Sequence, residues 1–299
     1  MPRLPVAGFL LMFALLSGSA AAAPACGKLP TKAGVVGYCV NETDRTKNPD
    51  ILYYLHGAFP AGIPDPEKAS IAPGNDLLTL WEQAHVERPT IVSISWGPTW
   101  VLKDDKLAAF ESEIVPQLEA LLTPAAGGHR MVLGASMGGL NAFHAWTRMP
   151  HLFQAAAFQC PAFTPFSPFA NGLEKVRRAH EIASLSTRGA VQQVKDTPGH
   201  YEQLDRFAEI FSPFFASTEE WLAYQPPAVT ALLDGRALPP AYLIYNAQDQ
   251  FGFDGAPEIA AAGLPITSER QSGKHCTGNW TIGLARFLSS HPVDPARAQ

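Results

Sequence analysis

Three residues in the last two-thirds of the chain have side chains that could carry out covalent chemistry together. Ser136 lies in the sequence G-A-S-M-G (residues 134–138), Asp249 follows a late apolar run, and His275 lies in the segment S-G-K-H-C-T-G (residues 272–278). A serine hydroxyl becomes a nucleophile when a histidine accepts its proton and a carboxylate fixes the tautomer of that histidine. The three residue types, in the order Ser, Asp, His, predict a catalytic triad.

The residues on either side of Ser136 predict a sharp turn between a strand and a helix. The apolar run 131–133 is typical of a buried strand, and the apolar residues of 140–146 recur at helical spacing. Gly134 and Gly138 have no Cβ atom, so they allow the close backbone approach that a strained turn at the serine requires. This context favours a nucleophile elbow, with the serine hydroxyl clear above the sheet, over a chance match of five letters.

We expect Asp249 and His275 to complete the triad. Asp249 comes shortly after the apolar run 241–246, and an acid just past a late strand is where the third member of such a triad lies. His275 precedes the last helical stretch, a position from which it can reach over the sheet to the serine. Asp254 is the alternative acid, but it is better placed to cap a helix over residues 256–262.

The segment after the apolar run 51–55 is expected to supply part of an oxyanion hole. This run ends in H-G-A-F-P (residues 56–60), and a strand leading into His-Gly is where such a fold offers a backbone N–H to a developing oxyanion. We expect the two donors to be the backbone N–H groups of Ala58 and of Met137, the residue after the serine. His56 itself is interpreted as a turn residue rather than a base.

The four cysteines, Cys26, Cys39, Cys160 and Cys276, predict two disulfide bonds if the chain is exported. Four cysteines allow three pairings. We favour Cys26 with Cys39, because the segment between them can form a hairpin, and therefore Cys160 with Cys276. The alternative is a zinc site formed by the second pair with nearby histidines. No C-x-x-C or H-x-x-x-H spacing supports that alternative, so we expect no metal. No phosphate-binding glycine loop of the form G-x-x-x-x-G-K-[ST] is present in the sequence, so we expect no nucleotide or flavin.

The first 23 residues are expected to be a secretory signal rather than part of the fold. Arg3 provides a positive start, residues 6–16 form an apolar core, and residues 17–23 are small. The apolar core is too short to span a bilayer comfortably, so we expect a periplasmic or secreted protein with no stable membrane insertion after the signal is removed. The formal net charge of -5 gives no electrostatic reason to bind nucleic acid or anionic membranes.

The remaining chain predicts an α/β fold built on a mostly parallel, doubly wound sheet. Short apolar runs alternate with amphipathic stretches, which favours strands joined by crossover helices. A long helix over residues 105–122 is expected to bury Leu107, Phe110, Ile114, Leu118 and Leu121. The expected strands are 34–40, 51–55, 90–95, 131–133, 153–158, 241–246 and 267–271, with a last helix over 280–289.

The sequences L-H-G (residues 55–57) and G-A-S-M-G (residues 134–138), followed by an acid and a histidine, resemble those of the α/β-hydrolase superfamily. Within it, the chain is most similar to secreted esterases of the esterase D and mycolyltransferase-like kind. The resemblance implies a serine esterase that acts on a small-molecule or polymer-linked ester through an acyl-enzyme. An acyltransferase with the same triad is the alternative, and a catalytically silent binding protein is a third hypothesis. Related esterases often have Asp or Thr after the catalytic histidine, where this chain has Cys276.

The sheet pattern stops between residues 161 and 239, where hydrolases of this kind insert a helical cap. We therefore expect a first part of the core over residues 24–160, a cap over 161–239 and a second part of the core over 240–299. Three aromatic residues near the expected site, Trp96, Trp100 and Phe163, are candidates for substrate contacts. Packing under the loops is the alternative for each of them. The sequence leaves the oligomeric state open.

Overall fold

The structure is a computed structural model that describes residues 25–58, 75–125, 127–163, 214–215, 218–233, 235–249, 255–278 and 280–290. Three sequence-based expectations lie outside these residues. They are the signal segment over residues 1–23, the larger part of the cap (residues 164–213), and the alternative acid Asp254.

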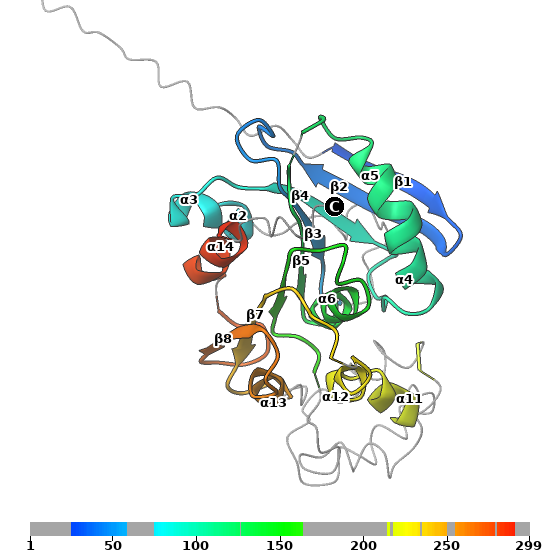
Figure 1. Cartoon of the computed structure of the whole chain (residues 1–299), viewed down its shortest axis with the longest axis vertical. Coiled ribbons are helices and arrows are strands. Elements are labelled where there is room, and N and C mark those ends of the chain that lie inside the picture. The colour runs from blue at the N-terminus through cyan, green and yellow to red at the C-terminus, as the bar shows by residue number, and fades with distance from the viewer. Residues whose placement is uncertain are drawn as a thin grey trace, which may run out of the picture.

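Eight strands in the described part of the chain form one mostly parallel sheet in the order β1-β2-β4-β3-β5-β6-β7-β8 (Figure 1). β1 pairs with β2, and β2 with β4, in antiparallel fashion, whereas the other neighbours are parallel. The strands are β1 (Ala25–Thr31), β2 (Gly34–Asn41), β3 (Ile51–Leu55), β4 (Thr90–Ser95), β5 (Arg130–Ala135), β6 (Ala155–Gln159), β7 (Ala241–Asn246) and β8 (Ile266–Gln271).

Helices cover both faces of the sheet, which confirms the doubly wound α/β fold (Figure 1). The central strands are mostly apolar because successive side chains enter two separate cores. In β3, Tyr53 and Leu55 enter one core, and Leu52 and Tyr54 enter the other. The helical elements are α2 (Asn75–Leu78), α3 (Leu80–Ala84), α4 (Asp105–Ala109), η1 (Phe110–Ile114), α5 (Val115–Glu119), α6 (Met137–Arg148), α11 (Thr218–Ala223), α12 (Pro226–Thr230), α13 (Ala256–Ala260) and α14 (Ile282–Ser289).

The segment expected as a single helix over residues 105–122 is helical to Glu119, but η1 is a stretch of π-helix between α4 and α5. Four of the five expected residues lie in or against the core, namely Leu107, Phe110, Ile114 and Leu118. The expectation is wrong for Leu121, which follows the end of α5 and is 56% exposed, whereas Leu122 enters the core.

Other element boundaries also differ from the sequence expectation. β6 begins at Ala155 rather than at residue 153, and the last helix begins at Ile282 rather than at residue 280. Within the expected helical cap, residues 218–230 form two short helices, α11 and α12, separated by Gln225, which has extended backbone angles. Pro226 follows as the first residue of α12, where its missing N–H leaves no helical hydrogen bond unmade.

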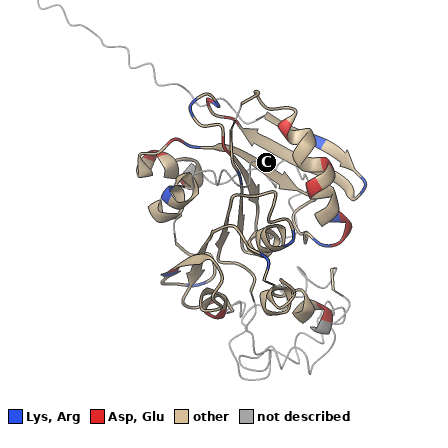
Figure 2. Cartoon of the chain, viewed as in Figure 1, with Lys and Arg blue, Asp and Glu red and all other residues tan. Residues whose placement is uncertain are grey.

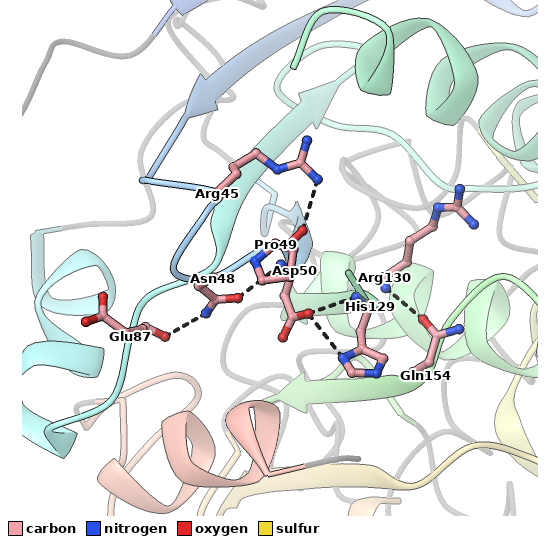
Figure 3. Close-up of polar contacts among 8 residues, drawn as sticks. All are labelled: Arg45, Asn48, Pro49, Asp50, Glu87, His129, Arg130 and Gln154. Atoms are coloured by element: carbon pink, nitrogen blue, oxygen red, sulfur yellow. Dashed lines mark hydrogen bonds and ion pairs between the residues drawn. The ribbon is translucent and has the colours of Figure 1, made fainter. Parts of the chain in front are cut away.

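A cluster of polar contacts fixes the starts of β3 and β5 at the edge of the sheet opposite Ser136 (Figure 3). Asp50 accepts hydrogen bonds from the backbone N–H of His129 at 2.8 Å and contacts the His129 ring at 3.1 Å. The backbone N–H of Arg130 donates to the side chain of Gln154 at 2.7 Å, so the residue just before β6 is attached to the start of β5. Because Ile51 pairs with Arg130, the carboxyl ends of β3 and β5 finish at the same level.

Charged residues lie mainly on the helices and the connecting loops, and both signs are interspersed over the described residues (Figure 2). The sheet interior is mostly apolar. No described helix combines the length and hydrophobicity that crossing a bilayer requires.

His144, on α6, is a buried histidine that packs against the segment between α11 and α12. Its Nε2–H donates to the backbone carbonyl of Tyr224 at 2.8 Å, and its ring stacks on the Tyr224 ring at 3.5 Å between centroids. Burial lowers the pKa of His144 from 6.5 to about 3. The folded protein therefore holds this imidazole neutral at pH values where the unfolded chain binds a proton.

We predict that the free energy of unfolding falls as the pH is lowered from 6.5 toward 3, because His144 has a lower pKa in the folded state. The contribution of neutral His144 to the free energy of unfolding is complete above pH 6.5. Between the two pKa values, the free energy of unfolding falls by up to about 1.4 kcal/mol per pH unit for this one proton. Urea denaturation at several pH values measures it. His144→Gln keeps a donor for the Tyr224 carbonyl but cannot titrate, so its slope should be smaller by about one proton. Equal slopes in the two proteins would contradict the prediction.

Candidate active site

Ser136 forms the sharp turn between β5 and α6, with backbone angles of φ 54° and ψ -117°. A non-glycine residue with positive φ is strained, and the surrounding backbone has to hold it there. A Cβ atom on Gly138 would lie 1.9 Å from the carbonyl oxygen of Leu55, and one on Gly134 would lie 1.9 Å from the carbonyl oxygen of Gly138. The expected reason for both glycines is therefore confirmed.

Ser136, His275 and Asp249 form one chain of hydrogen bonds. The Ser136 Oγ lies 2.7 Å from Nε2 of His275, and Nδ1 of His275 contacts the carboxylate of Asp249. The side chains of His275 and Asp249 are only 8% and 4% exposed. A neutral imidazole that donates from Nδ1 to a carboxylate has a free lone pair on Nε2, so it can accept the serine proton.

Asn246, at the end of β7, fixes the loop that carries His275. Its side-chain amide donates to the backbone carbonyl of Thr277 at 2.7 Å and accepts from the N–H of Cys276 at 3.1 Å. The sequence carries no distinctive signal for Asn246, because a polar residue at the end of a buried strand is too common to single it out.

The Cys160–Cys276 disulfide joins the end of β6 to the residue that follows His275. Ala135 of β5 pairs with Gln159 of β6, so the next residues along the chain, Ser136 and Cys160, lie beside each other. Both half-cystines have positive φ, 39° and 52°, a conformation that few residues other than glycine adopt. The disulfide therefore connects two strained turns on either side of the serine–histidine contact.

The second disulfide, Cys26–Cys39, links the paired strands β1 and β2. The two bonds are those that we favoured among the three possible pairings. The zinc alternative requires free thiols at Cys160 and Cys276. The two sulfur atoms and a ring nitrogen of His275 lie within 4.8 Å of one another, but the two sulfurs are bonded to each other.

The segment expected to supply an oxyanion donor lies directly against the elbow. Leu55 pairs with Gly134, so the residues that follow β3 run alongside those that follow β5. A Cβ atom on Gly57 would lie 3.2 Å from the Cβ of Ser136, and any larger residue would push the two loops apart. Ala58 is partly buried and packs against the core. Met137, the first residue of α6, is buried.

The three aromatic candidates for substrate contact lie in different environments. Trp100 is 1% exposed, packs on Trp96 at 5.1 Å between ring centroids, and donates its indole N–H to His56. Phe163 is fully buried against the ring of Phe143 at 5.2 Å. For Trp100 and Phe163 these contacts favour packing over direct contact with a substrate. Trp96 is partly exposed.

Residues 103–226 match a protein-family model described as "Putative esterase". The matched region includes α4 to α6, the serine turn and β6, but not the segments that carry Asp249 and His275. The resemblance to an esterase family is confirmed over this region of the chain. None of the curated proteins matches the chain.

Solved structures of esterases share the fold. A ferulic acid esterase is 17% identical, with a TM-score of 0.52 over 89% of this chain and 96% of its own. A fungal esterase from Rhizomucor miehei is 17% identical, with a TM-score of 0.55 over 89% of this chain and 80% of its own. The fluorophosphonate-binding serine hydrolase F of Staphylococcus aureus is 13% identical, with a TM-score of 0.52 over 89% and 96%.

We predict that replacing Cys160 and Cys276 together with serine slows the reaction of Ser136 with a fluorophosphonate. The loop that carries His275 would lose one of its attachments, and a displacement of about 1 Å at such a site can cost roughly 100-fold in rate. Because this bond joins residues 116 apart in the sequence, the double variant should also lose about 2–5 kcal/mol of stability. Labelling rates and urea denaturation measure the two effects.

The matched control replaces Cys26 and Cys39 with serine. This disulfide spans 13 residues and lies in the β1–β2 hairpin, at the far edge of the sheet from His275. Its removal should cost less stability and leave the labelling rate of Ser136 unchanged. Equal labelling rates in the two double variants would show that the Cys160–Cys276 bond has no specific effect on the serine.

Proposed function

We propose that this chain, which has the α/β-hydrolase fold and matches an esterase family over residues 103–226, is an exported serine hydrolase that cleaves carboxylic esters. The observation that supports this most strongly is the hydrogen-bonded chain from Ser136 through His275 to Asp249. The strained turn at Ser136 presents its hydroxyl to that chain, as covalent catalysis by a serine requires.

The reaction proceeds through an acyl-enzyme. Ser136 Oγ attacks the ester carbonyl carbon while its proton moves to Nε2 of His275. The tetrahedral intermediate collapses, the bond to the alkoxy oxygen breaks, and His275 returns the proton to the departing alcohol. Water then repeats the sequence with His275 as the base, which releases the acid and restores the serine. Asp249 stabilises the imidazolium at each stage without becoming protonated itself.

The oxyanion of the tetrahedral intermediate is held by the backbone N–H groups of Ala58 and Met137. Gly57 allows this because it packs directly against Ser136, which brings the two segments within reach of one acyl group. Loss of one such donor in comparable enzymes costs about 3–4 kcal/mol of transition-state stabilisation. Both donors are backbone groups at the ends of buried strands, so they need no reorganisation during the reaction.

Export is proposed from two features of the chain. The N-terminal residues have the composition of a secretory signal. Two disulfide bonds form in the described part of the chain, and disulfides persist in oxidising compartments outside the cytosol. The ester substrate thus belongs to the periplasm or the surroundings of the cell.

We predict that Ser136→Ala abolishes labelling by a fluorophosphonate and lowers kcat for p-nitrophenyl acetate by about 10⁴-fold or more, because it removes the proposed nucleophile. Wild-type protein should label once and turn over the ester. A panel that adds methyl ferulate is informative, since one structural neighbour is a ferulic acid esterase.

Ser112→Ala is the matched control. Ser112 is an exposed serine whose hydroxyl donates to a helix carbonyl, and it should leave both labelling and turnover unchanged. Labelling and hydrolysis that survive in Ser136→Ala would refute the proposed function.

A further inference from the structure

A buried tryptophan, a histidine and a peptide group form a second hydrogen-bonded chain beside Ser136. The indole N–H of Trp100 donates to Nε2 of His56 at 2.8 Å. An indole nitrogen can only donate, so Nε2 of His56 accepts and the ring proton is on Nδ1. Nδ1–H in turn donates to the backbone carbonyl of Gly57 at 2.6 Å. The direction of each hydrogen bond is therefore defined.

The carbonyl that His56 holds belongs to the peptide group between Gly57 and Ala58. A peptide group is planar, and in the trans form its C=O and N–H point in opposite directions. No cis peptide bond occurs among the described residues. A hydrogen bond that fixes the Gly57 carbonyl therefore also fixes the direction of the Ala58 N–H, which is one of the two proposed oxyanion donors.

The same tryptophan contacts the segment that carries the other donor. The backbone N–H of Trp100 lies 3.3 Å from Sδ of Met137. Asn141, one turn further along α6, accepts a hydrogen bond from the N–H of Leu102 at 2.7 Å and approaches the carbonyl of Trp100 at 3.4 Å. The loop after β4 is thus attached both to the Gly57–Ala58 peptide, through His56, and to the first turns of α6.

Burial keeps the hydrogen-bonded groups Trp100, His56 and Gly57 in one protonation state. His56 is 1% exposed, and desolvation lowers its pKa to about 4. A proton on Nε2 would face the indole N–H and break the contact. The imidazole is neutral at neutral pH, so the arrangement of donors and acceptors does not change there. Ser95 Oγ lies 2.7 Å from Nε2 of His56 and donates its hydroxyl proton to the carbonyl of Gly97 at 2.8 Å, which leaves the Nε2 lone pair to the Trp100 indole.

We propose that Trp100 and His56 are positioning residues that orient the oxyanion donors of this enzyme. The inference rests on the proposed function, and it assigns to both residues an effect on the transition state without contact with the substrate. A group that acts in this way changes kcat and leaves KM nearly unchanged, because it stabilises the charge that develops only after attack.

The first test compares Trp100→Phe with Trp146→Phe on p-nitrophenyl acetate. Trp146 is a matched control: it is fully buried, and its indole N–H donates to the carbonyl of Pro239 at 2.8 Å, remote from the serine. We expect Trp100→Phe to lower kcat by about 10–100-fold with KM within about twofold, since removing a whole oxyanion donor costs about 100–1,000-fold. Trp146→Phe should leave kcat unchanged.

The second test asks whether the Gly57 carbonyl is the group that matters. In His56→Asn the side-chain amide can take the place of Nδ1–H as donor to that carbonyl, whereas His56→Leu has no donor. His56→Asn also removes the acceptor for the Trp100 indole, so we expect it to lower kcat, but by less than His56→Leu, which should lose at least as much as Trp100→Phe. Circular dichroism and thermal unfolding identify any variant that fails to fold.

A thionoester provides a readout that a general loss of packing would not move. Its sulfur is larger and a weaker acceptor than oxygen, so an intact pair of N–H donors strongly prefers the oxygen ester. The ratio of kcat/KM for the ester to that for its thiono analogue should fall in Trp100→Phe and in His56→Leu. It should be unchanged in Trp146→Phe.

Equal kcat values and equal ester-to-thionoester ratios in Trp100→Phe and Trp146→Phe would overturn the positioning role. That result would leave the proposed function intact as long as turnover still depended on Ser136. Activity that survived in Ser136→Ala would instead overturn the proposed function.

Discussion

The close approach of two backbones at the serine turn is the constraint on which the rest of this structure depends. Gly138 lies so near the carbonyl of Leu55, and Gly134 so near that of Gly138, that neither position has room for a Cβ atom. This contact holds Ser136 at a φ of 54° and brings Gly57 against it. The proposed nucleophile and the proposed oxyanion donors are therefore both positioned by close packing between the residues that follow β3 and those that follow β5.

Other attachments at the same edge of the sheet hold the histidine. β7 and β8 are neighbours, and Asn246 at the end of β7 binds the loop that carries His275 through two hydrogen bonds. The Cys160–Cys276 disulfide adds a covalent link from that loop to the residue after β6. Side chains that are distant in the sequence thus meet because buried strands end at one level and short loops follow them.

The sequence predicts the parts of this arrangement that depend on local patterns. G-A-S-M-G between an apolar run and a helical stretch indicates the turn, and buried strands such as 51–55 are apolar throughout. Contacts between distant segments leave no such pattern. The indole hydrogen bond from Trp100 to His56 and the π-helical turn η1 both depend on packing that becomes visible only in the folded chain. The roles of Ala58 and Met137 remain predictions.

The most direct test of this account is a crystal structure of the protein after reaction with a p-nitrophenyl phosphonate, whose phosphorus mimics the tetrahedral carbon. We expect phosphorus on Oγ of Ser136, and the phosphoryl oxygen about 2.7–3.1 Å from the N–H groups of Ala58 and Met137. His275 should remain hydrogen-bonded to Asp249. An adduct on another residue, or a phosphoryl oxygen directed away from both N–H groups, would contradict the account.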